Sequence, residues 1–219
     1  MTITERILEG IEGGVNRHWR YVKELIKVKP EYLLTISVAD SLTKGFDNIH
    51  GIDVGIRLEE RTDKLASDIL FSAVGIHKFF ETERPKIKRK GKVDIYLKCD
   101  SGSFAVELKN FDPSAIELQK ELIRTQQLLL INDGNNTLRS AYVAFPTLID
   151  RSLWIDAKIK QYVDSQTIEA CATKKYIKTD EDPMDGIPAY YANCICLARK
   201  DAQQCVQPDL GDSARPSAG

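Results

Sequence analysis

The amino-acid sequence predicts an α/β fold, in which a mixed β-sheet carries helices on its faces. Three observations support this class. Two short apolar segments flank the turn sequence CDSGS at 99–103, which is typical of a β-hairpin. A helix-capping pattern at Ser114 and Glu117 then precedes a helical segment and the apolar run SAYVAFPT at 140–147, which is typical of a buried strand. Two more strand-like segments follow near the C-terminus.

Residues 1–50 predict two helices that form an N-terminal appendage. Apolar residues recur every three or four positions over 4–27, which indicates a helix with a break at Gly13-Gly14. Pro30 suits the start of a second helix, EYLLTISVADSL. The apolar stripe of the first helix predicts core packing, and a homodimer through this stripe is the alternative.

Residues 51–200 predict the main domain. It begins with an amphipathic helix that places Glu59 and Glu60 in its first turns, where acidic side chains also suit the helix dipole. Residues 201–219 are rich in Gln, Pro, Ser and Gly and predict a disordered tail. The helices and strands expected in the main domain lie, in order, at 56–76, 93–98, 104–109, 114–131, 140–147, 151–163, 167–178 and 188–199.

Composition argues against several classes of protein. No apolar run approaches the length of about 18 residues that a membrane helix needs, and acidic residues stand where a secretory signal would be basic and then apolar. We therefore expect a soluble, cytoplasmic protein. Five cysteines, an odd number, fit a reducing compartment. Cys194 and Cys196 lack a second pair and a nearby histidine, which argues against a zinc site.

The charge is unevenly distributed. The run RPKIKRKGK at 84–92 carries six positive charges, and because the whole chain carries −1, the remaining residues carry −7. We expect this run to bind nucleic-acid phosphates, with a solvated loop as the plainer interpretation. Its basic residues are Arg84, Lys86, Lys88, Arg89, Lys90 and Lys92.

Three charged residues interrupt the apolar segments of the predicted hairpin. Because side chains alternate along a strand, Glu107 and Lys109 share one face, and the antiparallel pairing can bring Asp94 beside Glu107. Two buried carboxylates repel each other unless a cation compensates, and Mg²⁺ or Mn²⁺ prefers such oxygen ligands. The carbonyl of Leu108 would be an additional ligand. Lys109 is then placed to hold an attacking water or to stabilise charge on a phosphate.

These residues resemble the signature of the PD-(D/E)XK nuclease superfamily, an acid, a spacer and then acid-x-Lys. VD at 93–94 is followed, thirteen residues after Asp94, by the ELK tripeptide that begins at Glu107. Val93 replaces the proline of the signature. The resemblance implies a restriction-endonuclease-like or RecB-like core of α-β-β-β-α-β type over about 56–148. It also implies that Asp94 and Glu107 are metal ligands and that Lys109 is the catalytic lysine.

Two more roles follow from the resemblance. Many members supply an acid from the first core helix, for which Glu59 and Glu60 are both candidates. Several place a glutamine on the helix after the lysine, and Gln119 fits that role, although Ile123 stands where a tyrosine would follow. Helical periodicity independently places Gln119 inside the apolar arc of its helix, where it would need a polar partner. A backbone partner is the alternative to a partner in the active site.

The resemblance implies a Mg²⁺- or Mn²⁺-dependent endonuclease that hydrolyses DNA with a metal-activated water, in restriction or anti-phage defence. If it recognises sequence, the N-terminal helices, the C-terminal hairpin or a partner protein must do so. One alternative is a nuclease fold without catalysis, which serves as a nucleic-acid-binding or assembly subunit. Another is a small interaction protein whose hairpin charges are solvated.

Overall fold

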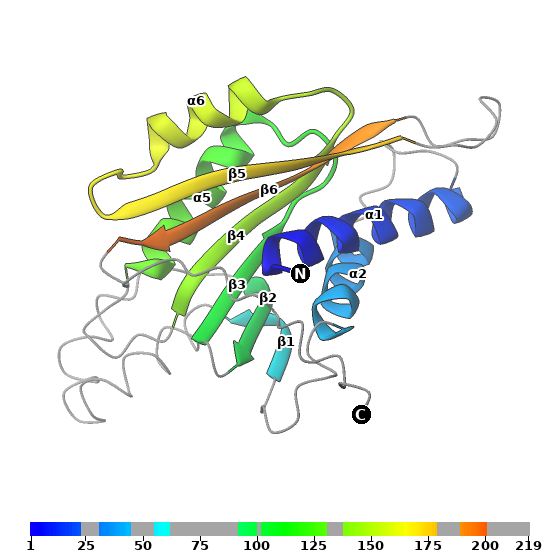
Figure 1. Ribbon diagram of the computed structural model, residues 1–219, viewed down its shortest axis with the longest axis horizontal. Coiled ribbons are helices and arrows are strands. Elements are labelled where there is room, and N and C mark those ends of the chain that lie inside the picture. Colours follow the sequence, from blue (N-terminus) through cyan, green and yellow to red (C-terminus); the bar gives the residue numbers. More distant parts are fainter. Residues whose placement is uncertain are drawn as a thin grey trace, which may run out of the picture.

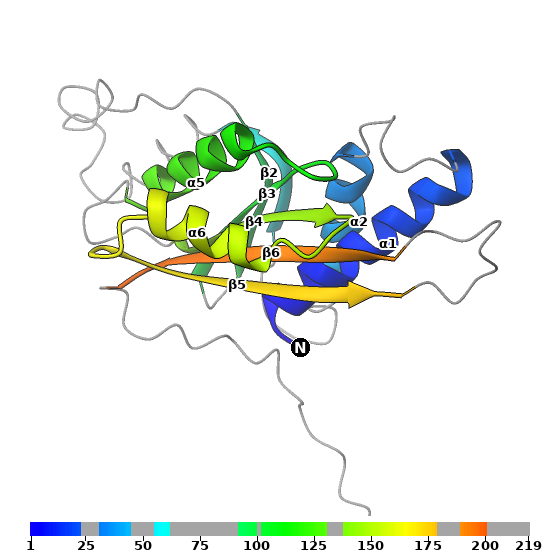
Figure 2. The ribbon, with the colours of Figure 1, turned by 90° about the horizontal axis from the view of Figure 1, so that it is seen from above.

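The computed structural model describes residues 1–22, 31–44, 55–61, 92–99, 102–130, 138–178 and 189–200. Within them a mixed β-sheet lies between helices (Figures 1 and 2). This confirms the α/β class. The helices are α1 (Ile3–Val22), α2 (Glu31–Lys44), α5 (Ala115–Leu129) and α6 (Ser152–Tyr162), and the strands are β1 (Gly55–Arg61), β2 (Lys92–Cys99), β3 (Gly102–Leu108), β4 (Leu138–Thr147), β5 (Ile168–Ile177) and β6 (Tyr190–Arg199).

The six strands lie in the order β1-β2-β3-β4-β6-β5. β3 and β4 are parallel, and α5 lies between them in the sequence, as the crossover between parallel strands requires. All other neighbours are antiparallel, including the expected pairs β2 with β3 and β5 with β6. The central strands β3 and β4 are buried along nearly their whole length, which explains their continuous apolar sequences.

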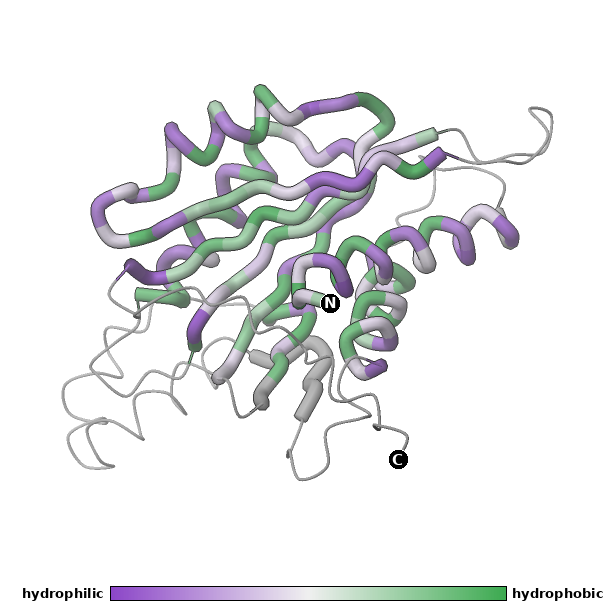
Figure 3. Tube along the Cα trace, in the orientation of Figure 1, coloured by the Kyte–Doolittle hydropathy of each residue, from purple (hydrophilic) through white to green (hydrophobic). Residues whose placement is uncertain are grey.

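The sheet separates two hydrophobic clusters. One joins the apolar faces of α1 and α2 to residues such as Val106, Ala144 and Cys194. The other joins α5 and α6 to the opposite face of the sheet, through residues such as Val143 and Phe145. Figure 3 shows how hydrophobic residues follow the central strands between these layers. The helices expected as an appendage over 1–50 thus pack against the sheet, and the apolar stripe of α1 is part of the core.

Helix α1 continues through Gly13-Gly14, so the predicted break there was wrong. The glycines of this helix serve packing against α2. A β-carbon on Gly10 would lie 2.4 Å from the Cα of Val38, and one on Gly14 would lie 3.0 Å from a methyl group of Leu34. The close approach of the two helices therefore depends on glycine at positions 10 and 14, whereas a β-carbon on Gly13 would meet nothing within 4 Å.

Residues 55–61 form strand β1, so the helix predicted from residue 56 was wrong over this range. The strand pairs antiparallel with β2 from Gly55↔Lys98 to Arg61↔Lys92. Residues 56–59 of the segment GIRLEER alternate apolar and charged side chains, a pattern that also starts a helical stripe. Pairing with the apolar strand β2 favours the extended form. The rest of the predicted helix lies outside the described residues.

A short connection between β3 and α5 sets the position of both. Asp112 adopts a positive φ of 50°, which aspartate tolerates better than most residues. Its backbone N–H donates to the carbonyl of Pro146 at 3.0 Å, and its carboxylate lies 3.1 Å from the guanidinium of Arg151. Helix α5 then starts at the predicted capping box, in which Ser114 and Glu117 each accept a backbone N–H of the other.

None of the helices in the described ranges is both long and apolar enough to cross a membrane.

Candidate active site

The candidate active site lies where the β2–β3 hairpin ends. Its backbone pairing stops at Ile95↔Val106. Immediately beyond, the carboxylate of Asp94 continues the pairing, because its Oδ2 accepts a hydrogen bond from the backbone N–H of Leu108 at 2.7 Å. Asp94 is half-buried. The side chain is therefore held by its own hairpin at the edge of the core.

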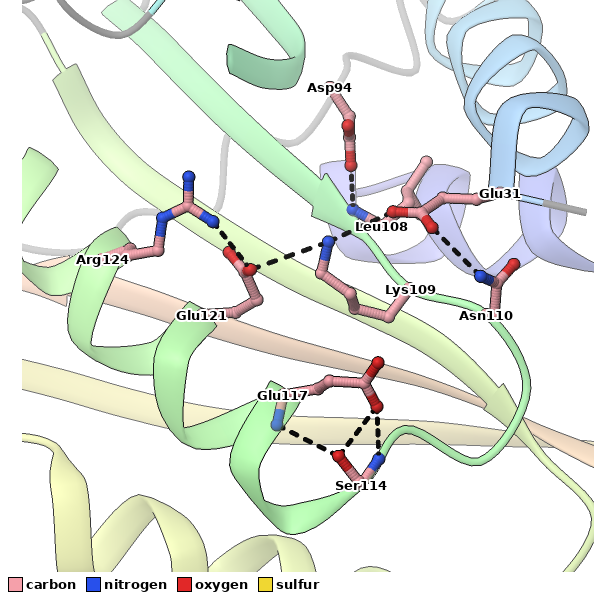
Figure 4. Close-up of polar contacts among 9 residues, drawn as sticks. All are labelled: Glu31, Asp94, Leu108, Lys109, Asn110, Ser114, Glu117, Glu121 and Arg124. Carbon is pink, nitrogen blue, oxygen red and sulfur yellow. Dashed lines mark hydrogen bonds and ion pairs between the residues drawn. The ribbon is translucent and has the colours of Figure 1, made fainter. Parts of the chain in front are cut away.

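Lys109 follows strand β3 directly. Its backbone N–H donates to the carbonyl of Ala144 at 2.9 Å, which extends the parallel pairing with β4. Its amino group lies 3.2 Å from Oε1 of Glu31 and 3.7 Å from Oε1 of Glu121. Figure 4 shows the amino group between these carboxylates, one from α2 and one from α5, with Asp94 nearby. The lysine thus connects the helices of the two layers.

Glu31 is the first residue of α2. Its Oε2 accepts a hydrogen bond from the side-chain amide of Asn110 at 3.0 Å, while Oε1 faces Lys109. One carboxylate therefore binds two consecutive residues of the connection after β3. The Glu31 side chain is 36% exposed, against 7% for Glu121, so it forms the open side of the cluster.

Glu121 forms the buried side. Its Oε1 accepts a hydrogen bond from Nη1 of Arg124 at 3.0 Å, one helical turn later on α5. Its Oε2 is buried and has no hydrogen-bond partner among the described residues. A buried acceptor without a partner costs about 1–3 kcal/mol. Within the described part of the chain, this oxygen is therefore an unsatisfied acceptor beside Lys109.

Glu107 completes the set from strand β3. It is 4% exposed and shares a strand face with Lys109, two residues later. Phe104, Val106 and Leu108 of the same strand belong to the cluster on the opposite face, as the alternation predicts.

Burial and the neighbouring charges shift two pKa values. Burial raises the pKa of Asp94 above its usual range, and the carboxylates of Glu31 and Glu121 add to that rise. The Leu108 N–H and the charge on Lys109 oppose it. Burial alone would lower the pKa of Lys109. The surrounding carboxylates more than reverse this and raise it, in the order Glu121, Glu31, Asp94 and Glu107.

The cluster has a surplus of negative charge. Four carboxylates surround Lys109, and with Arg124 as a second cation the formal sum is −2. Carboxylate oxygens are hard ligands that suit Mg²⁺ or Mn²⁺, and the buried Oε2 of Glu121 lacks a partner. The residue types therefore fit a divalent cation. As the side chains lie, no three His, Cys, Asp or Glu residues of the described ranges together form a site for a metal ion.

The structure thus brings Asp94, Glu107 and Lys109 together. Gln119 is half-buried on α5, about 200° around the helix from Glu121, and no hydrogen bond connects it to the cluster in the described part of the chain. Leu108, whose carbonyl is the predicted additional metal ligand, is the last residue of β3. Its backbone N–H donates a hydrogen bond to the carboxylate of Asp94.

The other predicted residues are only partly described. Glu59 and Glu60 lie on a strand and not on a helix, with the backbone of Glu60 opposite Val93. Lys92 is the first residue of β2. The remaining basic residues, Arg84, Lys86, Lys88, Arg89 and Lys90, lie outside the described residues.

Sequence reasoning missed Glu31, Glu121 and Asn110. A signal existed for Glu121, because it falls at helical spacing between the buried residues Leu118 and Thr125 of α5. Glu31 resembled an ordinary acid in the first turn of a helix, and it lies 78 residues from Lys109 in the sequence.

No family model, curated protein or solved structure matches this chain.

Proposed function

We propose that the protein is a metal-dependent endonuclease that hydrolyses DNA phosphodiester bonds. The observation that carries the proposal is the position of Lys109 at the end of the central hairpin, where its amino group lies 3.2 Å from Glu31 and 3.7 Å from Glu121 and is also stabilised by the charges of Asp94 and Glu107. A lysine beside clustered acids offers both a cation-binding set and a donor for a phosphate oxygen.

The sheet supports this proposal. β1, β2 and β3 form an antiparallel meander, α5 crosses over, and β4 returns parallel to β3. This order and pairing support the proposal, because the resemblance to the PD-(D/E)XK superfamily implies a core of α-β-β-β-α-β type. Asp94 lies on β2 and Glu107 on β3, two consecutive strands, which supports the metal-ligand roles that the resemblance implies.

The acids have distinct roles in this proposal. Asp94 and Glu107 would hold the cation, and Glu31 would supply the helix acid for which Glu59 and Glu60 were the sequence candidates. Glu31 suits that role because it contacts Lys109 directly and comes from a helix. Mg²⁺ or Mn²⁺ would supply Lewis-acid activation of the nucleophile and the phosphate.

Lys109 acts through its charge. The four carboxylates keep its amino group protonated, and a protonated amine can donate to a phosphate oxygen as negative charge builds there. Its backbone is fixed by the hydrogen bond to Ala144, which limits the lysine to motions of its side chain. Gln119 remains a candidate for contact with substrate.

Affinity for DNA would come from the basic run 84–92, which leads directly into β2. In this proposal, the N-terminal helices, the C-terminal hairpin or a partner protein would recognise the DNA sequence. The setting that the resemblance implies is restriction or anti-phage defence in the cytoplasm.

One observation favours a second candidate, a nucleic-acid-binding or assembly subunit without catalysis. Lys109 already has two carboxylate partners, and Asp94 already has a backbone partner. A cluster whose members satisfy one another can be structural.

The deciding experiment incubates the protein with plasmid, linear duplex and single-stranded DNA in Mg²⁺, Mn²⁺ or EDTA. We expect cleavage with either metal and none with EDTA. Lys109→Ala should be inactive, and Lys120→Ala, which removes an exposed lysine from α5, should remain active. Retention of DNA without cleavage in every metal would favour the second candidate, and neither binding nor cleavage would contradict both.

A further inference from the structure

Three cysteines lie on strands β5 and β6, which come later in the sequence than Lys109 and the carboxylates around it. Cys171 is on β5, and Cys194 and Cys196 are on β6. None of them is in a disulfide. The antiparallel register places Cys171 directly opposite Cys196, and it places Cys194 opposite Thr173. Of the two cysteines on β6, only Cys196 therefore faces another cysteine directly.

The register brings the two residues within disulfide range. Residues directly opposite each other in an antiparallel pair have Cα atoms about 4.5–5.5 Å apart, and their side chains share one face of the sheet. Disulfides span Cα distances of about 4.4–6.8 Å. The Cα separation expected for Cys171 and Cys196 therefore falls within the range that a disulfide spans.

The two thiols also differ in access, as an oxidation site requires. Cys171 is exposed, whereas Cys196 is half-buried and makes a side-chain hydrogen bond with the hydroxyl of the buried Tyr142. An oxidant can reach the first, and the second is held close to it. Cys194 is 1% exposed, and burial raises the pKa of its thiol well above the usual range, so it should be inert.

We propose that Cys171 and Cys196 are a thiol pair that a hydroperoxide converts to a reversible cross-strand disulfide. The thiolate of Cys171 attacks one peroxide oxygen, the O–O bond breaks, and the alcohol or water leaves, giving a sulfenic acid. The thiol of Cys196 then attacks that sulfur, the S–S bond forms and water is released. In sum, two thiols and one hydroperoxide give one disulfide, one alcohol or water from the peroxide, and one water.

The disulfide between Cys171 and Cys196 would attach an edge strand of the sheet to its neighbour. β5 is the last strand in the sheet order, and its residues 171–176 are exposed. A disulfide to β6 closes a loop from 171 to 196 and fastens this strand to its neighbour. The proposal is independent of the nuclease activity.

The experiment uses the full chain with Cys99→Ser and Cys205→Ser, so that Cys171, Cys194 and Cys196 are the only thiols. Treatment with hydrogen peroxide should remove two of three alkylatable thiols, and peptide mass spectrometry should find the Cys171–Cys196 link. The oxidised form should melt about 5–10 °C higher, and dithiothreitol should reverse both changes.

Matched variants test whether the disulfide forms between Cys171 and Cys196 and does not involve Cys194. Adding Cys194→Ser should leave the disulfide intact, whereas adding Cys171→Ser or Cys196→Ser should abolish it. Because Cys171 is exposed, Cys171→Ser should fold normally. A link from Cys171 to Cys194, disulfides only between molecules, or oxidation of Cys171 to a sulfinic acid without a link would each overturn the proposal.

Discussion

The carboxylate of Asp94 accepts a hydrogen bond from the backbone N–H of Leu108, with an Oδ2–N distance of 2.7 Å. The residue proposed as a metal ligand on one strand is thereby bonded to the residue between Glu107 and Lys109 on the next. Any shift of β2 against β3 would move the acids and the lysine relative to one another.

The first prediction concerns catalysis. Asp94→Asn, Glu107→Ala and Lys109→Ala should each lower metal-dependent cleavage by at least about 100-fold, because each removes a charge that acts on the cation or the phosphate. Circular dichroism should show a retained fold. DNA cleavage at the native rate by any of the three variants would make the active-site assignment wrong.

The second prediction concerns pH and stability. Because the folded-state pKa of Asp94 is raised, its ionisation costs stability above that pKa, and the cost is absent below the unfolded value near 3.8. Asp94→Asn should therefore raise the melting temperature without metal at pH 7. The gain should disappear as the pH falls through the folded-state pKa. Melting curves from pH 7 to pH 3 measure this, and a pH-independent difference would contradict it.

The third prediction concerns Glu121, which contributes most among the carboxylates to the raised pKa of Lys109. Glu121→Gln should lower that pKa, so the alkaline fall in cleavage rate should begin at a lower pH. Arg124→Gln is the matched control, because it removes the partner of Glu121 but keeps the carboxylate, and the alkaline limb should not move down. If Glu121→Gln also leaves it in place, Glu121 does not set the charge of Lys109.

The fourth prediction tests the contact between α1 and α2. Gly10→Ala should destabilise the protein by about 1–3 kcal/mol, because the new β-carbon would lie 2.4 Å from the backbone of Val38. Gly13→Ala on the same helix meets nothing within 4 Å and should stabilise by up to about 1 kcal/mol. Urea denaturation of both variants measures the difference. Equal effects would mean that the glycines do not set the helix contact.

The fifth prediction concerns the basic run. Changing Lys88, Arg89 and Lys90 together to alanine should weaken DNA binding uniformly across sequences and flatten the dependence of log K on log [salt] by roughly two to three units. Cleavage of bound DNA should change less than binding. Unchanged affinity and salt slope would indicate a solvated loop.

Local signals explain why most of the fold could be predicted. The capping box at Ser114 fixed the start of α5, and strand alternation placed Glu107 and Lys109 on one face. These features depend on neighbours a few residues away. The predictions for 55–61 and for Gly13-Gly14 were wrong because distant partners decide there: β2 pairs with the first segment, and α2 packs on the helix that contains the glycines.

In the candidate site, too, the residues that could be predicted depend on neighbours in the sequence, and those that were missed depend on distant contacts. Asp94, Glu107 and Lys109 follow from one hairpin, so their spacing in the sequence was informative. Glu31 joins them only because α2 packs across the end of β3, and a first-turn glutamate has no feature that reveals such a contact. Glu121 was within reach of the helical period, yet the family pattern and the predicted apolar arc both indicated Gln119, which is not among the buried residues of α5.

Helix α1 shares its hydrophobic cluster with Tyr190, Ala192 and Cys194 of β6. During synthesis, the first helix therefore leaves the ribosome long before the strand that covers part of its apolar face exists. Folding can be completed only when residues near 200 have been made, and nascent chains that stop before β6 would expose that face. We expect such truncated chains to depend on chaperones or to aggregate, even though they contain every acid of the cluster around Lys109.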